Sequence, residues 1–301
     1  MQIKWHEINT LKSGLGTASV VEISDIELLC DLLSKHRGQS GFRVLGYGSN
    51  LIGSDIDTGY TVVRLKRDGE FGRIVRKPEG DVIAGGACSL RTLADSWCRL
   101  GYGGGMAKLA GIPGTLGGAL KMNAGANGVE MSRFVIEMHG VNLKDGVSWE
   151  WCIDDGKDGW GYRRSPVPDD VVITEAVLQG GCFNGEADRP EDIVFEMNRR
   201  ASATPRGRSA GSIFRNPSEG SSAGKLLELA GCKGLAIGNA KVSEEHANWI
   251  VNVSGEPVRS SDILFLMHEM CQRVEARFGV KLVPEVRIAD GNGIHSIGEL
   301  S

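Results

Sequence analysis

The chain has 301 residues, of which 41% are hydrophobic and 24% are charged, and its formal net charge is -4 at pH 7. This length and composition indicate a globular protein with enough chain for two domains of ordinary size. The acidic balance provides no basic field for nucleic acid or an anionic membrane surface, so we expect neither as a partner.

The first half of the chain has the pattern of an α+β fold that opens with a strand, helix, strand unit. Ser24 and Glu27 have the spacing of a capping box, and the apolar stripe after them predicts a helix from Ile26 to near Gly38. A second helical stripe covers residues 89–101. The short β-branched runs predict strands in residues 42–51, 61–65, 72–77 and 81–86.

The second half also mixes the two element types. Residues 171–179 predict one more strand, and we place a domain boundary in the loop 180–190, where Gly, Asn and Pro concentrate. Beyond this loop, the expected elements are helices in residues 191–202, 223–231 and 260–279 and strands in residues 249–253 and 281–288.

The seven cysteines are dispersed along the chain and form no Cys-x-x-Cys pair. This pattern argues against a disulfide framework and a zinc site, so we expect reduced thiols and no metal. The N-terminus lacks the basic start and apolar run of a signal peptide, and no segment approaches the roughly 18 apolar residues of a membrane-spanning helix. We therefore expect a cytoplasmic protein.

Glycine is concentrated in two segments with the character of ligand-binding loops. Residues 110–130 contain six glycines among Ile, Leu and Met. Because glycine permits positive φ and close backbone approach, this segment predicts a backbone surface moulded around a cofactor. The loop Gly46–Asn50, GYGSN, could present backbone N–H groups to a pyrophosphate. Alone it is equally typical of a hairpin turn, since no Walker lysine and no complete GxGxxG follow.

The motifs resemble one family in order and spacing. They run from about Asn9 to Ile288 and read GYGSN, GIPGTLGGALKMNAGANG, YRRS, SAGSIFRNP, AGKLLELAG, KVSEEHANWIVN and PEVRI. In these motifs the chain resembles the UDP-N-acetylenolpyruvoylglucosamine reductases, the MurB-type flavoenzymes of peptidoglycan synthesis. The short stretch between YRRS and SAGSIFRNP is similar to the compact subclass that lacks an inserted tyrosine-bearing loop.

The resemblance implies an FAD-binding domain of the vanillyl-alcohol-oxidase (PCMH) type in residues 1–180, with two subdomains split near 55–65. A smaller α+β substrate domain would cover residues 186–288, followed by a polar tail in residues 289–301. FAD would be bound non-covalently, since no His lies in either glycine loop. The residues expected to hold FAD are Gly46, Tyr47, Gly48, Ser49, Asn50, Ile112, Pro113, Gly114, Thr115, Gly118, Asn123, Gly125 and Arg287.

The resemblance also carries three catalytic residues onto this chain: Arg163, Ser212 and Glu285. Hydride from NADPH, passed through FAD to C3 of an enolpyruvyl ether, leaves negative charge at C2 that requires a cation and a proton donor. Arg163 would hold the substrate carboxylate, Ser212 would deliver the proton, and Glu285 would help hold the enol form. The residues expected to contact UDP-N-acetylglucosamine enolpyruvate are Tyr162, Asn216 and Lys225. The expected state is a monomer.

Two positions depart from the family pattern and leave other functions open. Asn127 stands where the family commonly has an aromatic residue, and Lys108 stands where an acidic residue often precedes LAGIPGT. A non-catalytic paralogue that binds flavin or a nucleotide sugar would tolerate such changes. An FAD-dependent oxidase of a sugar or alcohol is a further alternative. The three intact catalytic positions favour the reductase, and His246 has the character of a structural histidine.

Overall fold

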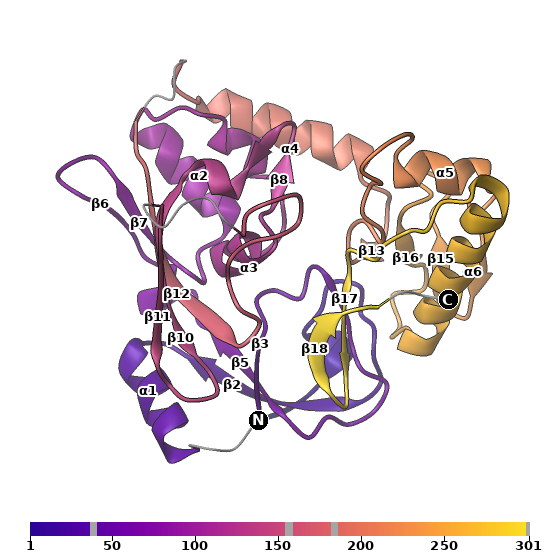
Figure 1. Cartoon of the computed structure of the whole chain (residues 1–301), viewed down its shortest axis with the longest axis horizontal. Helices are drawn as coiled ribbons and strands as arrows, with labels where there is room; N and C mark the ends of the chain where they lie inside the picture. Colours follow the sequence, from indigo (N-terminus) through magenta and orange to yellow (C-terminus); the bar gives the residue numbers. More distant parts are fainter. Residues whose placement is uncertain (37–40, 154–158, 182–185, 299–301) are drawn as a thin grey trace. The chain divides into compact units, whose positions relative to one another are not determined.

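The computed structural model describes residues 1–36, 41–153, 159–181 and 186–298, which form two compact units (Figure 1). Unit 1 consists of Met1–Val20, Tyr47–Thr61 and Thr204–Ser301, and unit 2 consists of Val21–Gly46 and Val62–Ala203. Both units contain helices and strands, which confirms the α+β prediction. Across the described ranges, no helix is long and apolar enough to cross a membrane.

These units are not the same as the predicted domains. Helix α4 (Pro190–Ala203) follows the predicted boundary loop, yet it belongs to unit 2. Residues 182–185 of that loop lie outside the described residues. The boundaries of the predicted FAD-binding and substrate domains therefore stay a prediction.

Unit 2 is built on a five-stranded sheet in which every neighbouring pair is antiparallel. Its strands in spatial order are β11 (Ser148–Cys152), β10 (Val135–Asn142), β12 (Val171–Leu178), β7 (Val82–Gly85) and β6 (Ile74–Arg76). Neither β10 nor β11 was expected from the sequence. Two register shifts in the pairing of β10 with β12 explain the failure for β10, because each shift interrupts the alternation of buried and exposed side chains.

The helices of unit 2 do not all bury an apolar face: residues 90–99 bury Leu90, Leu93 and Trp97, whereas α4 buries Ile193 and leaves Val194, Phe195 and Met197 exposed. These helices are α1 (Ile26–Lys35), α2 (Leu90–Arg99), α3 (Leu116–Lys121) and α4, with α2 and α3 drawn beside the five-stranded sheet in Figure 1. Trp97 of α2 has 0% exposure and contacts Phe134 edge to face at a centroid distance of 5.5 Å. The predicted cap of α1 was wrong by one residue: the Asp25 carboxylate, not Ser24, accepts from the backbone N–H of Leu28.

Unit 1 contains a four-stranded sheet packed against two helices. The strand order is β13 (Arg208–Ser209), β16 (Ile250–Asn252), β15 (Ala240–Val242) and β14 (Ala236–Ile237), and the helices are α5 (Ala223–Leu229) and α6 (Ser260–Phe278). The α6 side chains Ile263, Leu266, Met267, Met270 and Val274 are buried, and Phe278 is partly buried. Gly279 ends this helix in the left-handed conformation.

The end of the chain differs from the prediction of a strand in residues 281–288. The strand β17 spans Arg287–Asp290, pairs in parallel with β4 (Leu51–Ile52), and forms an antiparallel hairpin with β18 (Gly293–Ser296). Part of the expected polar tail is therefore a sheet edge of unit 1. Residues 299–301 lie outside the described residues.

The remaining elements are short. A four-stranded sheet has the order β1 (Gln2–Lys4), β2 (Thr17–Ile23), β5 (Thr61–Leu65) and β3 (Phe42–Val44), and the chain passes between the units within β2 and within β5. The others are β8 (Gly125–Ala126), β9 (Val129–Glu130) and the 3₁₀ turns η1 (Trp5–Glu7), η2 (Glu70–Gly72), η3 (Met106–Leu109) and η4 (Met131–Arg133).

A carboxylate far away in the sequence caps α6. The N-cap residue Arg259 makes no side-chain capping bond. Instead, Asp55 accepts from the backbone N–H groups of Ser260 at 2.9 Å and Ser261 at 3.0 Å. Since a helix N-terminus carries unsatisfied N–H groups and partial positive charge, this carboxylate stabilises the helix and joins Tyr47–Thr61 to the rest of unit 1.

We expect Asp55→Ala to lower the free energy of unfolding by about 1–2 kcal/mol, because it removes both capping bonds. Asp55→Asn keeps one acceptor oxygen and should lose less. Chemical denaturation of the three proteins measures the difference. As a control, Asp68→Ala removes an aspartate whose side chain is 77% exposed and should change stability little. Equal losses for Asp55→Ala and Asp68→Ala would contradict the capping role.

Candidate active site

The predicted FAD loop of residues 111–115, GIPGT, leads directly into α3. The Thr115 hydroxyl accepts from the N–H of Gly118 at 3.2 Å and so caps this short helix. The N–H of Gly117 donates to the carbonyl of Gly86 at 2.9 Å, and a Cβ at Gly117 would lie 3.2 Å from that oxygen. Glycine therefore lets the first turn of α3 lie against the end of β7.

The predicted FAD loops GYGSN and GIPGT meet at one point within unit 2. A Cβ at Gly46 would lie 2.7 Å from the Thr115 hydroxyl oxygen, so the beginning of GYGSN lies directly beside GIPGT. Gly114 has a φ of 141°, which L-residues rarely adopt. At both positions the backbone carries no side chain, which lets the two loops pack closely together. The expected residues Tyr47–Asn50 and Arg287 belong to unit 1.

Asn123, at the start of the predicted FAD loop NAGANG, binds the segment that carries Arg163. Its side chain has 0% exposure and donates to the Glu130 carboxylate and to the carbonyl of Gly161, both at 2.9 Å. Its carbonyl oxygen accepts from the N–H of Ser132 at 3.0 Å. Because the protein itself engages this side chain, any contact between Asn123 and FAD would fall to its backbone.

Arg163 lies in a tight turn with a strained backbone. Gly161 and Arg164 exchange two backbone hydrogen bonds, at 3.1 and 3.0 Å, and Arg163 between them has a φ of 55°. A non-glycine residue in this region costs about 1–2 kcal/mol and persists where its surroundings fix it. The Arg163 guanidinium lies 4.9 Å from the ring centroid of Tyr162, which is 48% exposed.

A second arginine, Arg200, lies near Arg163 and was not expected from the sequence. Arg200, in the last turn of α4, packs on the predicted FAD loop GIPGT, because a Cβ at Gly111 would lie 2.8 Å from the Arg200 Cδ. Burial, together with the positive charges of Arg199 and Arg163, holds the pKa of Arg200 below its usual value. Positive charge thus accumulates around Arg163, as a carboxylate-binding site requires. A helix-end arginine has no sequence signal that separates it from a solvated charge.

In unit 1, the backbone segments that carry Ser212 and Glu285 lie side by side. The backbone N–H of Glu285 donates to the carbonyl of Ile213, the neighbour of Ser212, at 2.7 Å. The Asn50 side chain donates to the carbonyl of Glu285 at 3.1 Å, and the Asn50 carbonyl accepts from the N–H of Arg287 at 3.1 Å. Asn50, predicted as an FAD contact, therefore also fixes the backbone of Glu285.

The other predicted residues occupy varied positions. Asn216 is exposed, and its side-chain oxygen accepts from the N–H of Ala223 at the start of α5. Lys225 is exposed on the same helix. The guanidinium of Arg287 donates to the carbonyl of Ile294 at 2.8 Å, so the β17–β18 hairpin orients this side chain.

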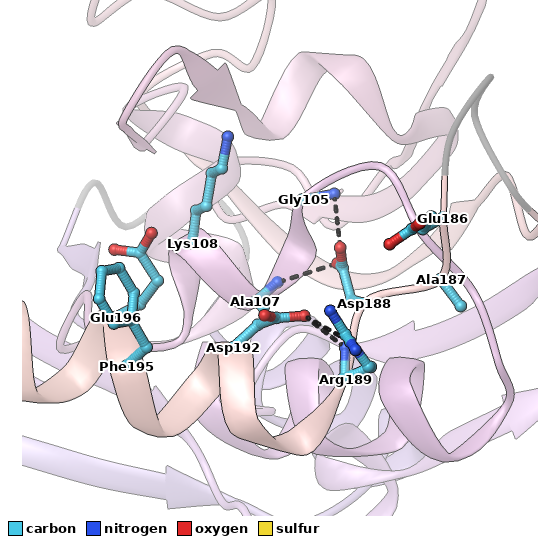
Figure 2. A pocket seen from close by; sticks show the side chains of 10 residues that line it. All are labelled: Gly105, Ala107, Lys108, Glu186, Ala187, Asp188, Arg189, Asp192, Phe195 and Glu196. Atoms are coloured by element: carbon cyan, nitrogen blue, oxygen red, sulfur yellow. Dashed lines mark hydrogen bonds and ion pairs between the residues drawn. The ribbon is translucent and has the colours of Figure 1, made fainter.

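A hollow of about 530 Å³ in unit 2 contains none of the predicted catalytic or cofactor residues (Figure 2). It is lined by Gly105, Ala107, Lys108, Glu186, Ala187, Asp188, Arg189, Asp192, Phe195 and Glu196. The Asp188 carboxylate accepts from the N–H groups of Gly105 and Ala107, both at 3.1 Å, and so anchors η3. Since its central carboxylate is engaged in holding backbone, we treat this hollow as structural.

Two family models match the chain. The model of the FAD binding domain matches residues 17–150. The model described as UDP-N-acetylenolpyruvoylglucosamine reductase, C-terminal domain, matches residues 203–289. The matched ranges include both glycine loops and the positions of Ser212 and Glu285.

Relatives with this name align along most of the chain. UDP-N-acetylenolpyruvoylglucosamine reductase 2 of Symbiobacterium thermophilum is 39% identical over 89% of this chain and 85% of its own length. The reductase of Rhizorhabdus wittichii is 35% identical over 92% of this chain and 87% of its own length. The crystal structure of UDP-N-acetylenolpyruvylglucosamine reductase from Thermus caldophilus superposes with a TM-score of 0.76 at 32% identity, covering 96% of this chain and 98% of that one.

We expect Asn123→Asp to destabilise the protein by about 1–3 kcal/mol at neutral pH, because it places a second carboxylate against Glu130. The like charge raises the pKa of the new aspartate in the folded state. The loss should therefore be small below about pH 4, the unfolded value, and grow as the pH rises towards the folded value. Thermal unfolding between about pH 4 and pH 8 measures this trend.

The matched control is the double variant Asn123→Asp with Glu130→Gln, which removes the like charge while keeping a donor and an acceptor at the contact. It should recover most of the stability lost at neutral pH. A loss that stays constant with pH in the single variant would show that charge at Glu130 is not the cause.

Proposed function

Because this chain belongs to the UDP-N-acetylenolpyruvoylglucosamine reductase family, we propose that it reduces UDP-N-acetylglucosamine enolpyruvate to UDP-N-acetylmuramate, with NADPH as the hydride donor and FAD as the cofactor. This reaction belongs to peptidoglycan synthesis. The observation that carries the proposal is the junction of Ser212 and Glu285 in unit 1, because it places a hydroxyl and a carboxylate on two adjoining, hydrogen-bonded segments.

The residues present fit FAD. Gly46 has no room for a side chain because it packs on Thr115, and Gly114 has a φ of 141°, so the two loops join through backbone that carries no side chains at these positions. When bound, FAD supplies hydride to C3 of the enolpyruvyl double bond. We propose that the backbone of both glycine loops holds the cofactor non-covalently, and that Arg287 faces one of its phosphates.

The proposed chemistry of the protein concerns the charge left at C2. Arg163 binds the adjacent carboxylate, and the neighbouring Arg200 adds to the positive field at that position. Ser212 gives its hydroxyl proton to C2. The high intrinsic pKa of a serine hydroxyl means that its neighbours must fix it and stabilise the oxygen as the proton leaves. Glu285, on the adjoining segment, would help hold the enol form.

We further propose a cytoplasmic location, which the state of the thiols supports. Burial raises the pKa of Cys88, Cys98, Cys232 and Cys271 to about 11. Such thiols ionise little at neutral pH and are poor nucleophiles. The described cysteines are free thiols, as a reducing compartment favours. The monomeric state stays a prediction.

We expect Ser212→Ala to slow substrate-driven reoxidation of the reduced flavin by about 10² to 10⁴-fold, the usual contribution of a general acid. Reduction of the flavin by NADPH should proceed as in the unchanged protein, because it needs no proton at C2. Anaerobic stopped-flow spectroscopy separates the two half-reactions: the flavin band bleaches with NADPH and recovers with the enolpyruvyl nucleotide sugar.

The control variant is Ser209→Ala, which removes a hydroxyl from the same motif and should leave both half-reactions unchanged. If Ser212→Ala slowed recovery by less than about tenfold, the proton-donor role would be wrong. A wild-type protein that holds flavin but never bleaches would support the non-catalytic alternative. Recovery that required oxygen instead of the nucleotide sugar would support the oxidase.

A further inference from the structure

The segment that carries Ser212 is buried but belongs to no strand. Ile213 and Phe214 have 0% and 1% exposure, and they lie outside the strands of the four-stranded sheet of unit 1. Buried backbone N–H and C=O groups require partners, and a missing partner costs about 1–3 kcal/mol for each group. The position of Ser212 therefore depends on what satisfies the backbone of its two neighbours.

One side of this segment is held by a single asparagine. The Asn248 side-chain oxygen accepts from the N–H of Phe214 at 2.9 Å, and its side-chain nitrogen donates to the carbonyl of Phe214 at 2.8 Å. The backbone carbonyl of Asn248 accepts from the N–H of Ile213 at 2.9 Å. The amide of Asn248 thus gives Phe214 the donor and acceptor that a neighbouring strand would give.

The other side of the segment is held by the chain around Glu285. The carbonyl of Ile213 accepts from the N–H of Glu285 at 2.7 Å, and Phe214 forms an isolated bridge with Pro284. Asn248 and Glu285 therefore bind the Ser212 segment from its two edges. If the bonds to Asn248 were lost, the Ser212 segment could shift relative to Glu285.

Asn248 is itself fixed in place. Its side chain is 3% exposed, and its backbone N–H donates to Nδ1 of His246 at 3.2 Å. Burial lowers the pKa of His246, so the imidazole is neutral at physiological pH and Nδ1 can accept this bond. Because Asn248 is fixed, its bonds to Ile213 and Phe214 can hold Ser212 in one position, which a mobile side chain could not do.

We propose that Asn248 is a positioning residue for proton delivery: its amide sets the Ser212 hydroxyl relative to Glu285. This inference rests on the proposed function, in which Ser212 gives the proton to C2. It distinguishes Asn248 from a buried asparagine that only supports the fold. Asn252 is such a residue, since it is 4% exposed and its side chain binds the turn at Ser254 and Glu256.

The experiment compares Asn248→Ala and Asn248→Asp with Asn252→Ala in the flavin-loaded protein. We expect all three to lower the melting temperature and to bleach normally with NADPH. Substrate-driven reoxidation should fall roughly 10- to 100-fold in the two Asn248 variants, the size of effect that a misplacement of about 1 Å produces, and less than about threefold in Asn252→Ala. The loss should appear in kcat with little change in KM for the nucleotide sugar.

Asn248→Asp provides a rescue test. An ionised aspartate cannot donate to the Phe214 carbonyl, whereas a protonated one has both a donor and an acceptor, as the amide has. The defect in reoxidation should therefore shrink as the pH falls in Asn248→Asp but not in Asn248→Ala. Reoxidation rates that match those of Asn252→Ala at every pH would overturn the proposal.

Amide hydrogen exchange separates this proposal from the proposed function. Asn248→Ala should lose protection at Phe214 and Glu285, and Asn252→Ala should keep it. If the wild-type flavin fails to recover with the nucleotide sugar, the proposed function is wrong, while exchange at these amides still decides whether Asn248 fixes the Ser212 segment. Unchanged protection in Asn248→Ala would reject the positioning role.

Discussion

The structure depends on one constraint: buried loops that have no strand partner must still form hydrogen bonds with their backbone groups. Most of the predicted catalytic and cofactor residues lie on irregular backbone, which must find hydrogen-bond partners away from water. The chain meets this need with asparagine, whose amide provides a donor and an acceptor in the geometry of a peptide group. Within the described part of the chain, four asparagines have no more than 5% exposure: Asn9, Asn123, Asn248 and Asn252.

The same constraint explains how a strained residue can be kept in place. The turn at Arg163 has a positive φ that an arginine does not favour, and the carbonyl of Gly161 in this turn accepts both from Arg164 and from Asn123. The bonds formed by the buried amide offset the strain locally. A guanidinium that must meet a carboxylate gains from this, because little rotational freedom of the backbone remains to be lost on binding.

Sequence patterns predicted the parts of the fold that depend on local spacing. The stripes of α2 and α6 and the glycine loops around α3 were found, because each signal lies within about 20 residues of chain. The cap of α6 by Asp55 was not found, since it joins positions 205 residues apart. Asn248 gave no signal for the same reason: its partner Phe214 is 34 residues away, and an isolated asparagine reads as a turn.

The residues proposed for proton delivery and those proposed for carboxylate binding belong to different units. Ser212, Glu285 and the asparagines that hold their backbone all belong to unit 1, whereas Arg163, Arg200 and Asn123 belong to unit 2. Proton delivery and carboxylate binding would then be set by two independent hydrogen-bond systems. Substitutions in one system should add to substitutions in the other in their effect on the free energy of unfolding, since residues that share no partner contribute almost additively to stability. Asn123 and Asn248 are the pair that would test this independence.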